Sequence, residues 1–114
     1  MTKPEFHISE GCFISEWSNT PDDPAVSIAR ARVPPGVVTR WHRLRGTVER
    51  YVVLEGRGRA YVGEREPQEV ATGDVVRIPP GWRQRIANTG ERDLIFLAIC
   101  TPRFVQDAYE ELEC

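Results

Sequence analysis

Residues 36–56 read GVVTRWHRLRGTVERYVVLEG, and this stretch decides the fold. Its second half is rich in β-branched and aromatic residues and ends at a glycine, which is typical of a strand followed by a turn. Side chains two positions apart point to the same face of a strand, so His42 and Leu44 share a face. If the turn at residues 46–47 forms a hairpin, Glu49 meets His42 across the strand pair. An imidazole beside a carboxylate indicates a metal site or a charge-coupled acid–base pair.

A second stretch, residues 73–88, reads GDVVRIPPGWRQRIAN. The sequence PPG at positions 79–81 is a strong turn signal, and it separates two short extended runs. In the second run Gln84 and Ile86 share a face. Arg83 and Arg85 take the opposite face.

Short strands and turns also account for most of the remaining sequence. Nine Gly and nine Pro suit many strands joined by turns better than a helical bundle. At least eight short strands leave a sandwich, a jelly roll or a small barrel as the all-β alternatives. The exception is the tail, where apolar residues at positions 104, 108 and 112 predict a short helix over residues 104–112.

Length, charge and cysteine content restrict the class of protein. The 114 residues fit a single domain over residues 1–114. A formal net charge of −2 gives no general attraction to nucleic acid or to an anionic membrane. The N-terminus lacks an apolar signal segment, and the three cysteines lack metal-type spacing, with Cys100 expected to be buried. These features predict a cytoplasmic protein.

The two stretches resemble the paired motifs of the cupin superfamily. The first family motif is G-x5-H-x-H-x(3,4)-E-x6-G, and residues 36–56 match it at every position except the second histidine. The second is G-x5-P-x-G-x2-H-x3-N, and residues 73–88 match it except at the histidine. The resemblance implies a cupin double-stranded β-helix, a jelly-roll-like small barrel, followed by the C-terminal tail at residues 101–114. It also implies a homodimer.

The departures from the motifs bear on the metal site. Most metal-binding cupins ligate through the two histidines and the glutamate of the first motif and the histidine of the second. Here Leu44 and Gln84 replace two of those histidines, so three candidate metal ligands remain: His42, Glu49 and Gln84. One nitrogen and two oxygen ligands would suit Mn, Fe or Ni better than a closed tetrahedral Zn site. Whether a divalent metal is bound, or has been lost and left a hydrogen-bonded polar site, stays open.

Alternation suggests further residues for a substrate pocket: Arg40, Leu44, Tyr51 and Arg103. Arg40 shares the face of His42, and Tyr51 shares that of Glu49, although Tyr51 could equally be a core aromatic residue. Arg103 follows the last strand and could help cover the mouth as a lid. Val52 and Leu54 alternate outward, which suggests a facing sheet or a partner subunit.

Two functions compete on this sequence. The first is an enzyme of dioxygenase, isomerase, cyclase or lyase type acting on a small oxygenated metabolite, with a metal or with His42 or Glu49 as general base. The second is a non-catalytic module that binds a sugar or another small ligand and has lost its metal. A purely structural subunit has no positive support.

Overall fold

The computed structural model describes residues 3–112, and short antiparallel strands dominate it. The strands are β1 (Phe6–His7), β2 (Phe13–Ser18), β3 (Ser27–Val33), β4 (His42–Leu44), β5 (Val48–Glu55), β6 (Arg57–Val62), β7 (Gln68–Ala71), β8 (Val75–Ile78), β9 (Gln84–Asn88), β10 (Leu94–Thr101) and β11 (Tyr109–Glu111). Within residues 3–112, no helix is long and apolar enough to cross a membrane.

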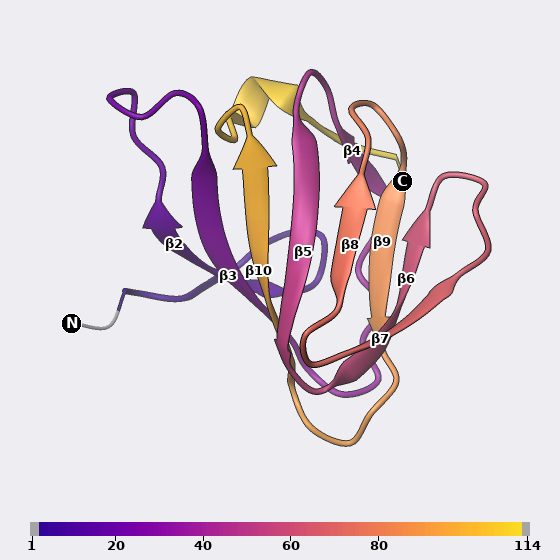
Figure 1. Cartoon of the computed structure of the whole chain (residues 1–114). Helices are drawn as coiled ribbons and strands as arrows, with labels where there is room; N and C mark the ends of the chain where they lie inside the picture. Colours follow the sequence, from indigo (N-terminus) through magenta and orange to yellow (C-terminus); the bar gives the residue numbers. More distant parts are fainter. Residues whose placement is uncertain (1–2, 113–114) are drawn as a thin grey trace.

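The strands form two sheets that face each other and enclose the interior (Figure 1). The six-stranded sheet has the order β1-β2-β3-β10-β5-β8, and the five-stranded sheet has the order β11-β4-β9-β6-β7. The many crossovers between non-consecutive strands are those of a jelly-roll-like barrel. The all-β, jelly-roll-like small barrel expected from the sequence is confirmed.

The apolar core lies at one end of this barrel. Val33 of β3, Val53 of β5 and Leu94 and Phe96 of β10 are almost completely buried there. Leu94 lies opposite Val33 and Phe96 opposite Val53 in the strand registers, so these side chains form one packed layer. The buried Cys100, further along β10, confirms its expected burial.

Gly56 allows the chain to turn tightly between β5 and β6. Its φ is +83°, and a Cβ at this position would lie 2.6 Å from the carbonyl oxygen of Asp93. Both the left-handed backbone and the close approach favour glycine. The glycine that ends the first motif is therefore explained by packing.

The hairpin expected between the His42 and Glu49 strands does not form. β4 lies between β11 and β9 in the five-stranded sheet, whereas β5 lies between β10 and β8 in the six-stranded sheet. The chain crosses from one sheet to the other at Gly46, whose φ is +74°. His42 and Glu49 therefore face each other across the barrel, from opposite sheets.

The helix expected over residues 104–112 is also wrong. The tail forms a single 3₁₀ turn, Gln106–Ala108, and then strand β11, which pairs with β4. The edge of β4 offers backbone partners, with Tyr109 opposite Leu44 and Glu111 opposite His42. These tertiary hydrogen bonds outweigh a weak helical pattern.

Candidate functional site

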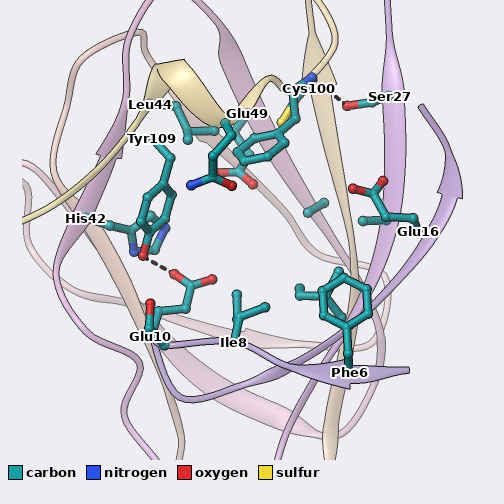
Figure 2. A pocket seen from close by; sticks show the side chains of 16 residues that line it. Phe6, Ile8, Glu10, Glu16, Ser27, His42, Leu44, Glu49, Cys100 and Tyr109 are labelled. Atoms are coloured by element: carbon teal, nitrogen blue, oxygen red, sulfur yellow. Dashed lines mark hydrogen bonds and ion pairs between the residues drawn. The ribbon is translucent and has the colours of Figure 1, made fainter. Parts of the chain in front are cut away.

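A cavity of about 390 Å³ occupies the other end of the barrel (Figure 2). The N-terminal segment and the C-terminal tail contribute to its wall, together with β2, β3, β4, β5 and β10. Its lining residues are Phe6, Ile8, Ser9, Glu10, Ile14, Glu16, Ser27, Ala29, His42, Leu44, Glu49, Ala98, Cys100, Phe104, Gln106 and Tyr109. A smaller hollow of about 40 Å³ shares Glu10, His42 and Glu49 with it and adds Tyr51.

The His42 side chain is held in place by burial, by two polar contacts and by an aromatic neighbour. It is 4% exposed on β4, and its Nδ1 lies 2.9 Å from the carbonyl oxygen of Arg40 and 2.8 Å from Oε2 of Glu10. The ring of Tyr109 stacks on the imidazole, with 5.5 Å between the ring centroids. Both polar contacts engage Nδ1, which leaves Nε2 as the ring nitrogen that can meet a ligand.

Glu10 holds the position of the His42 ring and also sets its charge. Burial alone would lower the pKa of His42, but the hydrogen bond and the charge of Glu10, with the Arg40 carbonyl and Glu49, raise this pKa to about 9. The Glu10 backbone is fixed in turn, because its carbonyl accepts a hydrogen bond from the N–H of Arg40 at 2.8 Å.

Sequence reasoning missed both Glu10 and Tyr109. Neither lies in the two motif stretches, and each comes from a segment near a chain end that crosses the mouth of the barrel. Glu10 sits in a turn between β1 and β2, where alternation assigns no face. Tyr109 would have been found only if the tail had been interpreted as a strand paired with β4.

Glu49 faces the same cavity from the opposite sheet. Burial raises the pKa of its carboxyl to about 7, against the opposing charge of His42. Its Oε1 is buried and has no hydrogen-bond partner in the described part of the chain. A buried carboxylate oxygen without a partner raises the free energy of the folded state. A ligand that donates a hydrogen bond to this atom would remove that penalty.

Gln84 lies beside His42. Its carboxamide contacts Tyr51 and helps to lower the pKa of Glu49 without lining the cavity itself. The two residues are paired in register between β4 and β9, and Gln84 is 1% exposed. The hydroxyl of Tyr51 donates a hydrogen bond to Oε1 of Gln84, so the carboxamide oxygen is already engaged. Tyr51 itself packs against Phe96 in the core, with ring centroids 4.5 Å apart. Gln84 thus does not line the cavity.

The other pocket candidates divide into one inside the cavity and two outside it. Leu44 is buried and lines the cavity on the same face as His42. Arg40 is exposed outside the cavity, because β4 begins only at His42 and alternation does not extend back to residue 40. Arg103 binds Oδ1 of Asn19 at 2.8 Å, and its neighbour Phe104 contributes to the cavity wall instead.

The donor atoms do not fit the metal that the family motifs imply. Leu44 cannot ligate, and Gln84, whose carboxamide oxygen accepts the Tyr51 hydrogen bond, does not line the cavity. In residues 3–112 no three His, Cys, Asp or Glu side chains converge on a point that could hold a metal ion. His42 and Glu49 remain, and two ligands are too few for a resident divalent ion.

Comparisons with known proteins place this architecture in a family. A family model described as a cupin domain matches residues 29–100. An uncharacterised protein of Methanocaldococcus jannaschii is 37% identical over 87 residues, which are 76% of this chain and 69% of that protein. A glucose-6-phosphate isomerase of Pyrococcus horikoshii is 38% identical over 63 residues, which cover 52% of this chain but only 33% of the isomerase. Among solved structures, Streptomyces PAC13 (H42Q) with uridine superposes with a TM-score of 0.81 at 17% identity, over 97% of this chain and 85% of that one.

Proposed function

The chain belongs to the cupin family, and on that premise we propose that it is an enzyme that moves a proton on a small oxygenated metabolite, in a reaction of isomerase or lyase type. The proposed groups are His42 and Glu49, with Glu10 as the positioning residue. No resident metal takes part. The alternative, a binding module without chemistry, remains an outcome of the test below.

The contact between Glu10 Oε2 and His42 Nδ1, at 2.8 Å, carries this proposal. A carboxylate on one imidazole nitrogen fixes the ring orientation and leaves the other nitrogen for the reacting molecule. A general acid needs its imidazole held in one orientation and one protonation state, and the Glu10 carboxylate provides both.

Geometry and charge give the two groups different roles. With a pKa of about 9, His42 carries a proton at neutral pH and serves as a general acid toward a substrate oxygen. With a pKa of about 7, Glu49 serves as a base near neutral pH and removes a proton from the adjacent carbon. One proton leaves carbon for Glu49 and one reaches oxygen from His42, so the substrate becomes its enol without net change in charge.

The test is solvent exchange, because it detects proton removal whatever product the enzyme forms. Small hydroxyketones and hydroxyaldehydes, such as dihydroxyacetone and glyceraldehyde, are incubated with the protein in D₂O, and loss of the α-proton signal is followed by NMR. We expect exchange with wild-type protein and a loss of about 100-fold or more with Glu49→Gln and with His42→Gln. No exchange with any member of the panel would overturn the proposal and leave the binding module.

Metal analysis of the same samples tests the other half of the proposal. We expect exchange to persist after chelator treatment, and substoichiometric Mn, Fe, Ni and Zn in wild-type protein. Stoichiometric metal that disappears in both His42→Ala and Glu49→Ala would overturn the metal-free assignment. Leu44→His adds a second imidazole on the cavity face of His42 and is the positive control for metal uptake.

We further propose that the chain acts as a homodimer in the cytoplasm. Support for the dimer comes from the outer face of the six-stranded sheet, where Leu54 is 37% and Val75 52% exposed beside the half-buried Val52. Val52 and Val75 are directly opposite in the register of β5 and β8, so the apolar side chains adjoin. Support for a reducing compartment comes from Cys12 and Cys100, which are free thiols.

A further inference from the structure

We infer that the cavity takes small molecules that donate hydrogen bonds and carry no negative charge, and that it excludes carboxylates and phosphates. The inference concerns the ligand of the proposed enzyme and rests on the same cavity. It depends on which polar groups line the wall and on which groups are missing from it.

The first observation is a set of buried oxygen atoms without hydrogen-bond partners. Oε1 of Glu49 and the hydroxyl of Tyr109 form no hydrogen bond within residues 3–112, whereas Oε2 of Glu10 is taken up by Nδ1 of His42. Both Glu49 and Tyr109 line the cavity. Carboxylate oxygens only accept hydrogen bonds, so the missing partner must supply O–H or N–H groups. A ligand with hydroxyl or amino groups meets this need.

The second observation is the charge of the wall. Glu10, Glu16 and Glu49 line the cavity, and among the described residues His42 is the only lining side chain that can carry a positive charge. The arginines that the sequence placed near the site lie elsewhere, with Arg40 exposed and Arg103 bound to Asn19. The one imidazolium, His42, is already paired with Glu10, so a carboxylate or phosphate inside the cavity would meet the remaining carboxylates without a free guanidinium or ammonium partner, which raises its free energy.

Glu16 extends this preference to the entrance. It is exposed on β2, lines the cavity, and has no hydrogen bond or ion pair among the described side chains. Its unpaired carboxylate therefore adds negative charge at the entrance, within reach of a molecule that is entering the cavity. Arriving anions are therefore repelled before they reach Glu49, whereas hydroxyl compounds and amines are not.

The matching isomerase of Pyrococcus horikoshii is named for glucose 6-phosphate, a phosphorylated sugar. The cavity of this chain offers that phosphate no guanidinium or ammonium partner from its described lining. We therefore expect this chain to bind a neutral or cationic ligand, unlike the phosphorylated sugar for which that isomerase is named.

Charged thiol reagents test the charge of the cavity without requiring the natural ligand. Ala98 lines the cavity and is half-buried, so Ala98→Cys in a Cys100→Ala background places one new thiol on the wall. Its reaction with methanethiosulfonate reagents bearing a trimethylammonium or a sulfonate group is followed at the peptide level by mass spectrometry. Thr89→Cys, on an exposed turn, is the matched control, and Ala29→Cys replaces Ala98→Cys if the latter fails to fold.

We expect the cation-to-anion rate ratio at residue 98 to exceed that at residue 89 by about tenfold, and Glu16→Gln to lower it. A ratio at residue 98 equal to or below the control would overturn the inference. This result is independent of the exchange assay, so a protein inactive there can still satisfy or contradict the inference.

Glucose, glucosamine and glucose 6-phosphate then form a matched neutral, cationic and anionic set, followed by NMR shift changes at cavity residues. Binding of either of the first two in preference to the phosphate supports the inference and identifies hydroxyl or ammonium groups as the donors. Tighter binding of glucose 6-phosphate than of glucose at these residues would contradict it.

Discussion

The two ends of the barrel use the same strands and the same alternation, yet one end is a packed core and the other a cavity. Along β10 the inward side chains run Leu94, Phe96, Ala98, Cys100, and the first two are core while the last two line the cavity. The neighbouring strands change in parallel, from Val33 to Ser27 on β3 and from Val53 to Glu49 on β5.

The difference shows how a small barrel makes room for a site without losing its core. Large side chains at one end provide the burial that stabilises the fold, and small or polar ones at the other leave 390 Å³ unfilled. The chain ends then cover the open end and bring Glu10 and Tyr109 to His42. We therefore expect stability and chemistry to be separable by position along the same strand.

We expect the largest loss of stability when a large side chain is removed from the packed core end of the barrel. Leu94→Ala removes a fully buried side chain from the packed layer and should lower the free energy of unfolding by about 3 kcal/mol. Leu44→Ala, at the wall of the cavity, should cost about half as much, because its side chain already borders open space. Urea unfolding of the two variants measures the difference, and equal losses would mean that the two ends are packed alike.

The next effect concerns pH and belongs to the open end. Folding raises the pKa of His42 from 6.5 to about 9, so the folded state holds the proton more tightly. The stabilisation is complete below pH 6.5 and is lost as pH rises through 9, which should cost about 3 kcal/mol. Glu49, raised from 4.5 to about 7, likewise makes the protein less stable as pH rises between those values.

Unfolding measured across this range, with His42→Gln and Glu49→Gln as controls, separates the two contributions. His42→Gln should flatten the upper part of the profile and Glu49→Gln the lower part. A wild-type profile that rises from pH 5 to 9, where both raised pKa values require a fall, would show that these environments have been assigned incorrectly.

The third prediction concerns the oligomeric state, which we expect to depend on the outer face of the six-stranded sheet. Leu54→Glu places a charge on the proposed dimer surface and should shift the protein toward the monomer, with a loss of about 2 kcal/mol of association energy or more. Light scattering after size exclusion measures the mass. Glu55→Gln, the adjacent exposed residue, is the control. A monomeric wild type would refute the dimer.

The smallest effect is expected at Arg40, outside the cavity. Arg40→Ala removes an exposed side chain and should change the free energy of unfolding by less than about 0.5 kcal/mol, with exchange activity unchanged. A large loss of activity in D₂O exchange would mean that this guanidinium reaches the site after all.

Sequence reasoning was sufficient for the fold because turn signals and family motifs act locally. Gly56 marked the end of a strand in the sequence, although its close approach to Asp93 is a tertiary contact, and the burial of Cys100 followed from its apolar surroundings. The inward direction of His42, Leu44 and Glu49 also followed, although the expected hairpin between β4 and β5 was wrong. Alternation gives the face of a strand but does not identify its neighbour.

The rest of the site depends on tertiary contacts, which cannot be predicted from strand alternation or turn signals in the sequence. Glu10 reaches His42 from a turn, and Tyr109 does so because the edge of β4 captures the tail as a strand. Gln84 was assigned by motif position, but the Tyr51 hydroxyl takes its carboxamide oxygen, a contact 33 residues apart in sequence. Arg40 was misplaced because the strand begins two residues later than alternation assumed.

The most direct test of the site is the NMR titration of the two histidines, His7 and His42, assigned with His7→Gln. We expect His42 to titrate near pH 9 in wild-type protein and at clearly lower pH in Glu10→Gln, because the carboxylate on Nδ1 holds its proton. A His42 that titrates at or below 6.5, or that is unaffected by Glu10→Gln, would contradict a carboxylate-positioned imidazole.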